Sequence, residues 1–124
     1  LLNTLGMVFY ARGDWRRAGR VMRRGLRAAA LTGDERLEVK LRNNLGNVLW
    51  KTGDLAGARA LYRDNLAFCE RVRDPWGQLS ALNNLGILDC SQGEWKRARE
   101  SLGRSFELAL VNALAPFYNS EVYE

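Results

Sequence analysis

The fold is decided by the stretch Leu41–Asp54, which reads LRNNLGNVLWKTGD. Two other stretches follow the same pattern, LLNTLGMVFYARGD at residues 1–14 and ALNNLGILDCSQGE at residues 81–94. The Leu-Gly pair, the Asn two residues before it and the Gly-acid pair after it each recur every 40 residues, and so does an alanine, at Ala18, Ala58 and Ala98. Registers that agree over three copies indicate a repeat protein, in which each copy is one unit of supersecondary structure.

Each repeat divides into two amphipathic helices. In the second repeat, residues 34–52 place apolar side chains on one face at helical spacing, namely Leu37, Leu41, Leu45, Val48 and Leu49. Gly53 suits the left-handed residue that ends a helix, and Asp54 supplies a capping oxygen for the next helix. That helix, at about residues 55–72, carries a second inward set of Leu55, Ala58, Leu61, Tyr62, Leu66 and Cys69.

The turns between repeats carry an aspartate as well, Asp34 and Asp74, and Pro75 follows where its missing N–H costs nothing. These signals place the repeats at residues 1–33, 34–73 and 74–113. The sequence therefore predicts an all-α superhelix of three antiparallel helix pairs, with residues 114–124 forming a terminal half-repeat helix. Because residue 1 falls inside a first helix by this phase, we expect the array to be cut from a longer chain that continues in both directions.

Glycines recur inside the first helices, at Gly6, Gly46 and Gly86. A glycine in a helix interior costs about 1 kcal/mol relative to alanine, so three at one phase need a structural reason. We expect the bare backbone to let the second helix approach closely, with the alanine of the second helix as the matching small side chain.

Composition excludes several classes of function. The chain has no histidine, which removes the commonest general base and the commonest metal ligand. Cys69 and Cys90 form no CxxC pair, so neither a zinc site nor a disulfide framework is expected. No phosphate-binding glycine loop occurs, and no apolar run is long enough for a membrane span. We therefore expect a cytoplasmic protein that is not an enzyme and has no catalytic residue, cofactor or metal.

These motifs resemble the tetratricopeptide repeat family over essentially the whole chain. The family has Leu-Gly in the first helix, a large apolar residue three positions later, such as Phe9 or Leu49, and a small residue in the second helix. Its usual repeat is 34 residues long. The longer spacing and the string Asn43–Gly46 are similar to the long-repeat branch, which includes animal spindle-orientation adaptors, kinesin light chains and the arrays of bacterial regulators. The arginine-rich, lysine-poor composition favours a bacterial regulator.

The third repeat departs from the pattern at one position. Asp89 stands where Phe9 and Leu49 stand in the other repeats, so we expect looser packing of the third repeat at that point.

The resemblance implies that the first helices line a concave groove that holds an extended or helical peptide. With Leu45 at the centre of the buried face, the opposite side of the first helices supplies the candidate peptide-binding residues, which are Asn3, Met7, Tyr10, Arg36, Lys40, Asn43, Asn47, Trp50, Lys51, Trp76, Ser80, Asn83, Ile87 and Ser91. The last residues of the chain would add Asn119, Ser120 and Tyr123.

This face has three features that suit a protein ligand. A row of carboxamides, each with a donor and an acceptor for a peptide main chain, lies at Asn3, Asn43 and Asn83. Amphipathic aromatic residues of the kind found in binding hot spots lie at Tyr10, Trp50 and Trp76. Basic residues lie at Arg36, Lys40 and Lys51. The hypothesis is a partly acidic, partly apolar segment, with its backbone on the asparagines.

The same residues allow structural interpretations. The asparagine row could instead hydrogen-bond neighbouring helices, as we expect of Asn44 and Asn84. Trp50 could equally pack under the neighbouring repeat. Trp15 and Trp95 follow the Gly-acid turn, where the family often has an aromatic residue, and we expect them in the core. Self-association through exposed ends of the solenoid is a further alternative.

Nucleic-acid or anionic-surface binding is the alternative function. The net charge is +5, and seven arginines lie mostly on the second helix of the first repeat, at Arg12, Arg16, Arg17, Arg20, Arg23, Arg24 and Arg27. No aromatic residues interleave with them to stack bases. We therefore favour a solvated outer face whose aliphatic stems cover apolar surface.

Overall fold

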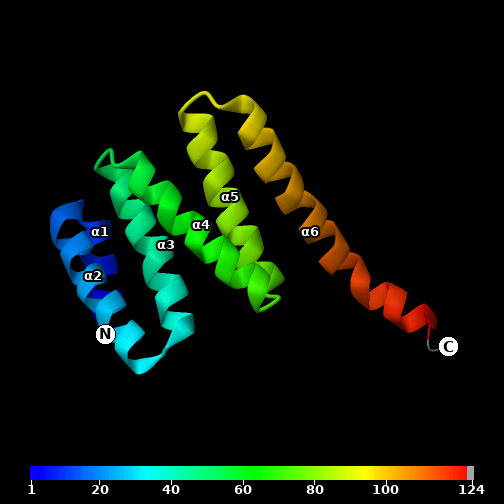
Figure 1. Cartoon of the computed structure of the whole chain (residues 1–124), viewed down its shortest axis with the longest axis horizontal. Helices are drawn as coiled ribbons and strands as arrows, with labels where there is room; N and C mark the ends of the chain where they lie inside the picture. Colours follow the sequence, from blue (N-terminus) through cyan, green and yellow to red (C-terminus); the bar gives the residue numbers. More distant parts are fainter. Residues whose placement is uncertain (123–124) are drawn as a thin grey trace. The chain divides into compact units, whose positions relative to one another are not determined.

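The computed structural model describes the backbone of residues 1–122 and the side chains of residues 1–113. Every regular element in this part is a helix, and the order along the chain is α1 (Leu2–Ala11), α2 (Trp15–Thr32), α3 (Glu35–Lys51), α4 (Leu55–Arg71), α5 (Pro75–Ser91) and α6 (Trp95–Val122) (Figure 1). The predicted all-α helical-repeat fold is confirmed. The chain divides into two compact units, Leu1–Asn65 and Leu66–Glu124.

Aspartate caps and left-handed residues set the helix boundaries. A backbone N–H donates to the side chain of the aspartate three residues earlier, over 2.9–3.2 Å, at Asp14, Asp34, Asp54 and Asp74. Glycines with positive φ, between 71° and 91°, occupy the turns at Gly13, Gly33, Gly53 and Gly93. Arg73 takes the same conformation, with φ 57°, and is the one non-glycine residue in the described part that does so. The predicted cap at Asp54, left-handed Gly53 and first-turn Pro75 are confirmed.

The first unit packs α1, α2, α3 and the start of α4 around one apolar core. Its buried members are Ala18, Met22 and Ala29 from α2 and Leu41, Leu45 and Val48 from the predicted inner face of α3. Partly buried side chains cover this cluster, namely Phe9, Tyr10, Leu26, Leu37, Leu49 and Leu61. The periodicity of the sequence therefore identified the inner face of α3 correctly.

The helix-interior glycines meet larger partners than the sequence suggested. A Cβ atom on Gly6 would lie 2.8 Å from Cγ of Met22, and one on Gly46 would lie 2.6 Å from Cε1 of Tyr62. On Gly86 it would lie 2.6 Å from the Leu102 side chain. The alanines at the matching phase are buried, but the space over each glycine is filled by the residue one turn after the alanine. The expectation that the alanine side chain is the partner is corrected accordingly.

In the second unit, α5 and α6 form an antiparallel pair (Figure 1). Its buried side chains include Ala81, Leu82, Leu85 and Leu88 from α5 and Ala98 from α6. The expected separate helix at residues 114–124 is wrong as far as the described backbone goes, because α6 continues without a break to Val122. The physical reason is a missing turn signal. Where Gly33-Asp34 and Arg73-Asp74 supply a left-handed residue and a cap, the chain has Ala113-Leu114.

Candidate functional site

The candidate peptide-binding residues with described side chains lie on α1, α3 and α5. On α3 they form a row, called here the α3 row, of Arg36, Lys40, Asn43, Asn47, Trp50 and Lys51. The equivalent α5 row consists of Trp76, Ser80, Asn83, Ile87 and Ser91. No member of either row is buried. Asn119, Ser120 and Tyr123 lie outside the residues whose side chains the structure describes.

One member of the asparagine row joins two helices of the first unit. Nδ2 of Asn44 on α3 donates a hydrogen bond of 2.8 Å to Oδ1 of Asn3 on α1. Asn3 is half-buried, and its acceptor oxygen is occupied by this contact. The structural role expected of Asn44 is therefore confirmed, and Asn3 shares that role.

Asn47 is likewise held from inside the unit. The hydroxyl of Tyr62 on α4 donates a hydrogen bond to Oδ1 of Asn47, while the Tyr62 ring lies fully buried against the backbone of Gly46. Burial, with a smaller contribution from Tyr10, raises the pKa of Tyr62 to about 12. The hydroxyl therefore stays protonated at neutral pH and orients the Asn47 carboxamide, whose Nδ2 makes no hydrogen bond with the described residues.

The remaining members of the α3 row divide into basic and half-buried side chains. Arg36, Lys40 and Lys51 are exposed. Asn43 and Trp50 are half-buried, and Asn43 also interacts within the chain. The exposed part of this row therefore carries positive charge, which suits acidic side chains in a ligand.

The α5 row presents apolar side chains to solvent. Trp76 is 68% exposed and Ile87 is 40% exposed, although the buried face of the same helix carries Leu82, Leu85 and Leu88. Asn83 lies exposed between the two, and it makes no hydrogen bond with any side chain that the structure describes. The row thus combines an aromatic residue, an available carboxamide and an aliphatic residue on one side of one helix.

Two tryptophans expected in the core are outside it. Trp15 is 37% exposed and Trp95 is 68% exposed, so that expectation is wrong. Each is the first residue of its helix, directly after an acidic residue, Asp14 or Glu94. A side chain in the first turn lies beside the turn rather than between the paired helices, so it meets fewer neighbours.

The arginines of α2 form an exposed surface. All seven residues of the set predicted from the sequence are exposed, six of them on α2 and Arg12 at the C-cap of α1. Arg17 pairs with Asp14 at 3.4 Å, and its guanidinium lies 5.8 Å from the centre of the Phe9 ring. This arrangement agrees with aliphatic stems that cover apolar surface while the charges stay in water.

Comparison with known families places these features in context. A family model described as tetratricopeptide repeat matches residues 37–110, which include most of the second repeat, the turns Gly53-Asp54 and Gly93-Glu94 and most of the third repeat. The chain belongs to the tetratricopeptide repeat family. Repeats of this family generally mediate protein–protein interactions and are typically not enzymes. A comparison with curated proteins gives no match.

Other classes of site receive no support from the described residues. Among them, no group of three or more His, Cys, Asp or Glu side chains could hold a metal ion. In the same part of the chain, no helix is long and apolar enough to cross a membrane. Burial raises the pKa of the Cys69 thiol, with nearby Asp74 adding to the effect, which disfavours the reactive thiolate.

Proposed function

We propose that this tetratricopeptide repeat chain binds a peptide segment of another protein on the outward faces of its first helices. In this proposal it is the interaction module of a larger cytoplasmic, bacterial regulatory protein. The single observation that carries the binding proposal is the α5 row, where Trp76 and Ile87 face solvent on either side of Asn83.

The chemistry of the α5 row suits a peptide. Covering exposed Trp and Ile side chains stabilises a complex by roughly 25 cal/mol per Å² of apolar surface. The Asn83 carboxamide can both donate to and accept from a peptide bond. The row spans about 20 Å along the helix axis, a length that roughly six extended residues of a ligand would cover.

The α3 row adds a preference for charge. Its exposed members are Arg36, Lys40 and Lys51, and these suit acidic residues of a ligand. Asn47 contributes donors, because its oxygen already accepts from Tyr62. The proposed ligand is therefore partly acidic and partly apolar.

A two-step experiment tests this function. Proteins crosslinked to the chain in a bacterial lysate are digested, and each crosslinked segment is synthesised as a peptide. Calorimetric titration then compares the native chain with the double variant Trp76→Ala, Asn83→Ala. We expect affinity to fall at least about tenfold, since a buried aromatic contact and a main-chain hydrogen bond are both lost.

The matched control is Trp95→Ala, which removes a tryptophan of the same 68% exposure on α6, outside the row. Native affinity in this control, together with the loss in the double variant, locates the ligand on α5. Equal affinity of the native chain and the double variant would show that the α5 row is not the binding surface.

A further inference from the structure

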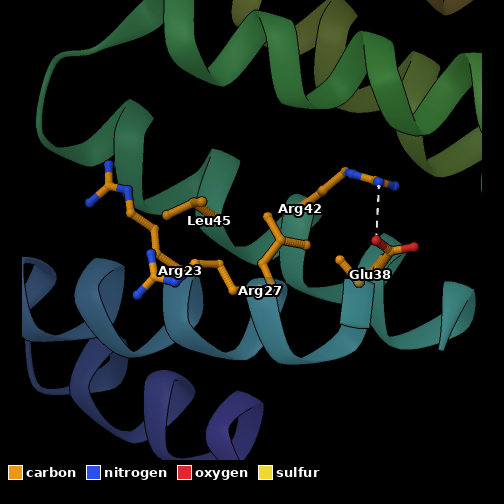
Figure 2. A pocket seen from close by; sticks show the side chains of 7 residues that line it. Arg23, Arg27, Glu38, Arg42 and Leu45 are labelled. Atoms are coloured by element: carbon orange, nitrogen blue, oxygen red, sulfur yellow. Dashed lines mark ion pairs between the residues drawn. The ribbon is translucent and has the colours of Figure 1, made fainter. Parts of the chain in front are cut away.

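A second surface lies between α2 and α3 of the first unit. It is a shallow, open hollow of about 490 Å³, shown in Figure 2, and its lining residues are Arg23, Leu26, Arg27, Ala30, Glu38, Arg42 and Leu45. None of these residues belongs to the α3 row or to the predicted peptide-binding face.

The hollow combines an apolar floor with a basic rim. Leu26, Ala30 and Leu45 supply the apolar surface, and three arginines with one carboxylate give the lining a net charge of +2. The carboxylate is already engaged, because Glu38 pairs with Arg42 at 3.7 Å, as the dashed line in Figure 2 marks. Arg23 and Arg27, which enter the hollow from α2, have no ion pair with any residue that the structure describes.

Arg42 occupies a position where the other repeats carry leucine. By the 40-residue period its counterparts are Leu2 and Leu82, and Leu82 is only 1% exposed. The Arg42 side chain is 23% exposed, so a charged group here gives up hydration that leucine would not lose. Arg27 corresponds to Ala67 in the next repeat. Arg27 and Arg42 are therefore particular to this pair of helices, whereas Arg23 recurs as Arg63 in the next repeat.

We propose that this hollow is a docking site for an acidic segment of a partner protein. A carboxylate of the segment pairs with Arg23 and Arg27, and a neighbouring apolar side chain covers Leu26 and Leu45. Charge complementarity decides the occupant, since two guanidinium groups without carboxylate partners stand beside an apolar floor. This site is independent of the proposed peptide binding by the α3 and α5 rows.

The lining favours a peptide over a nucleic acid. None of its residues is aromatic, so a base has no ring on which to stack. The apolar floor would remove water from a phosphodiester without replacing its hydrogen bonds.

Fluorescence anisotropy with a defined probe tests the proposal. The probe is a short fluorescein-labelled peptide of repeated Glu-Leu-Glu units, and a peptide with Gln in place of Glu is its neutral counterpart. We expect the native chain to bind the acidic probe, and the double variant Arg23→Glu, Arg27→Glu to bind it at least about tenfold more weakly.

A second variant, Arg42→Leu, keeps the fold because leucine stands at the same position of the other two repeats. It removes one rim charge and leaves Glu38 without its partner, so we expect binding of the acidic probe to fall about threefold or more. Thermal unfolding of each variant, compared with the native chain, confirms that the fold is intact.

The matched control is Arg16→Glu, Arg20→Glu. These arginines are exposed on the same helix at the same four-residue spacing, but neither lines the hollow. If this control binds the acidic probe with native affinity and Arg23→Glu, Arg27→Glu binds it more weakly, the result supports a site in the hollow. An equal loss in both double variants, or equal binding of the neutral peptide, overturns the proposal. So does tighter binding of labelled single-stranded DNA that only Arg23→Glu, Arg27→Glu abolishes, because the hollow would then be a nucleic-acid site.

Discussion

The carboxamide of Asn44 donates a hydrogen bond to the carboxamide of Asn3 over 2.8 Å, and this contact joins the first helices of two neighbouring repeats. Both side chains are half-buried, so breaking the bond leaves a polar group with restricted access to water. Asn3, which the sequence analysis assigned to the peptide-binding face, therefore helps to hold α1 against α3.

A double-mutant cycle of Asn3→Ala and Asn44→Ala measures this contact. We expect each single variant to lower the free energy of unfolding, and the double variant to lower it by less than the sum of the two. The coupling should be about 0.5–1.5 kcal/mol, the usual range for a neutral hydrogen bond. Urea denaturation gives all three values, and strictly additive losses would contradict an interaction between these residues.

Gly46→Ala should destabilise the first unit. The new methyl group would lie 2.6 Å from Cε1 of the fully buried Tyr62, which cannot move without disturbing the core. Overpacking of this kind costs about 1–3 kcal/mol, and the gain in helix propensity, about 1 kcal/mol, offsets only part of it.

The matched control is Gly103→Ala in α6, where nothing lies within 4 Å of the added atom. There we expect stabilisation of about 0.5–1 kcal/mol, and a stabilising Gly46→Ala would refute the close packing.

Stability should fall at high pH because of Tyr62. Its pKa is raised from 10.0 to about 12 in the folded chain, so the folded state resists losing this proton more than the unfolded state does. The contribution is fully present below pH 10 and is lost as pH rises towards 12. At about 1.4 kcal/mol per unit of pKa difference, the loss reaches roughly 3 kcal/mol.

Unfolding by urea at several values between pH 9 and pH 12 measures this loss. Tyr62→Phe should be less stable than the native chain at neutral pH by about 0.5–1.5 kcal/mol, because Asn47 loses its hydrogen-bond donor. Its stability should nevertheless decline less steeply above pH 10. Parallel curves for the two proteins would assign the decline to other groups.

Local signals made most of the fold predictable. The Gly-Asp pairs set φ and the cap by the chemistry of two adjacent residues, and the leucine spacing of α3 identified its buried face. The turn missing at Ala113-Leu114 was also readable, since neither residue favours a left-handed turn or a cap. The expectation of a new helix at residue 114 came from the 40-residue spacing alone. It did not take into account that Ala113 and Leu114 lack the turn and cap signals of the earlier repeats.

Contacts between helices were harder to predict. The partner of Gly46 depends on how far Tyr62 reaches across the helix pair, and the exposure of Trp95 depends on what surrounds the first turn of α6. Neither is fixed by residues nearby in sequence. The α2–α3 hollow had one sequence signal, Arg42 at a leucine position, but its meaning required the neighbouring position of Arg23 and Arg27.

Arg73→Gly should stabilise the chain. Arg73 has φ 57°, in the left-handed region that costs a side chain about 1–2 kcal/mol, and it stands where the previous repeat has Gly33. Glycine removes that strain but gains freedom in the unfolded chain, which returns part of the benefit. We expect a net rise of about 0.5–1 kcal/mol in the free energy of unfolding.

Arg71→Gly, two residues earlier in the last turn of α4, is the control and should be destabilising by about 1 kcal/mol. The Arg71 guanidinium lies 5.2 Å from the centre of the Phe68 ring, so this control also loses a ring contact. A destabilising Arg73→Gly would contradict strain at Arg73.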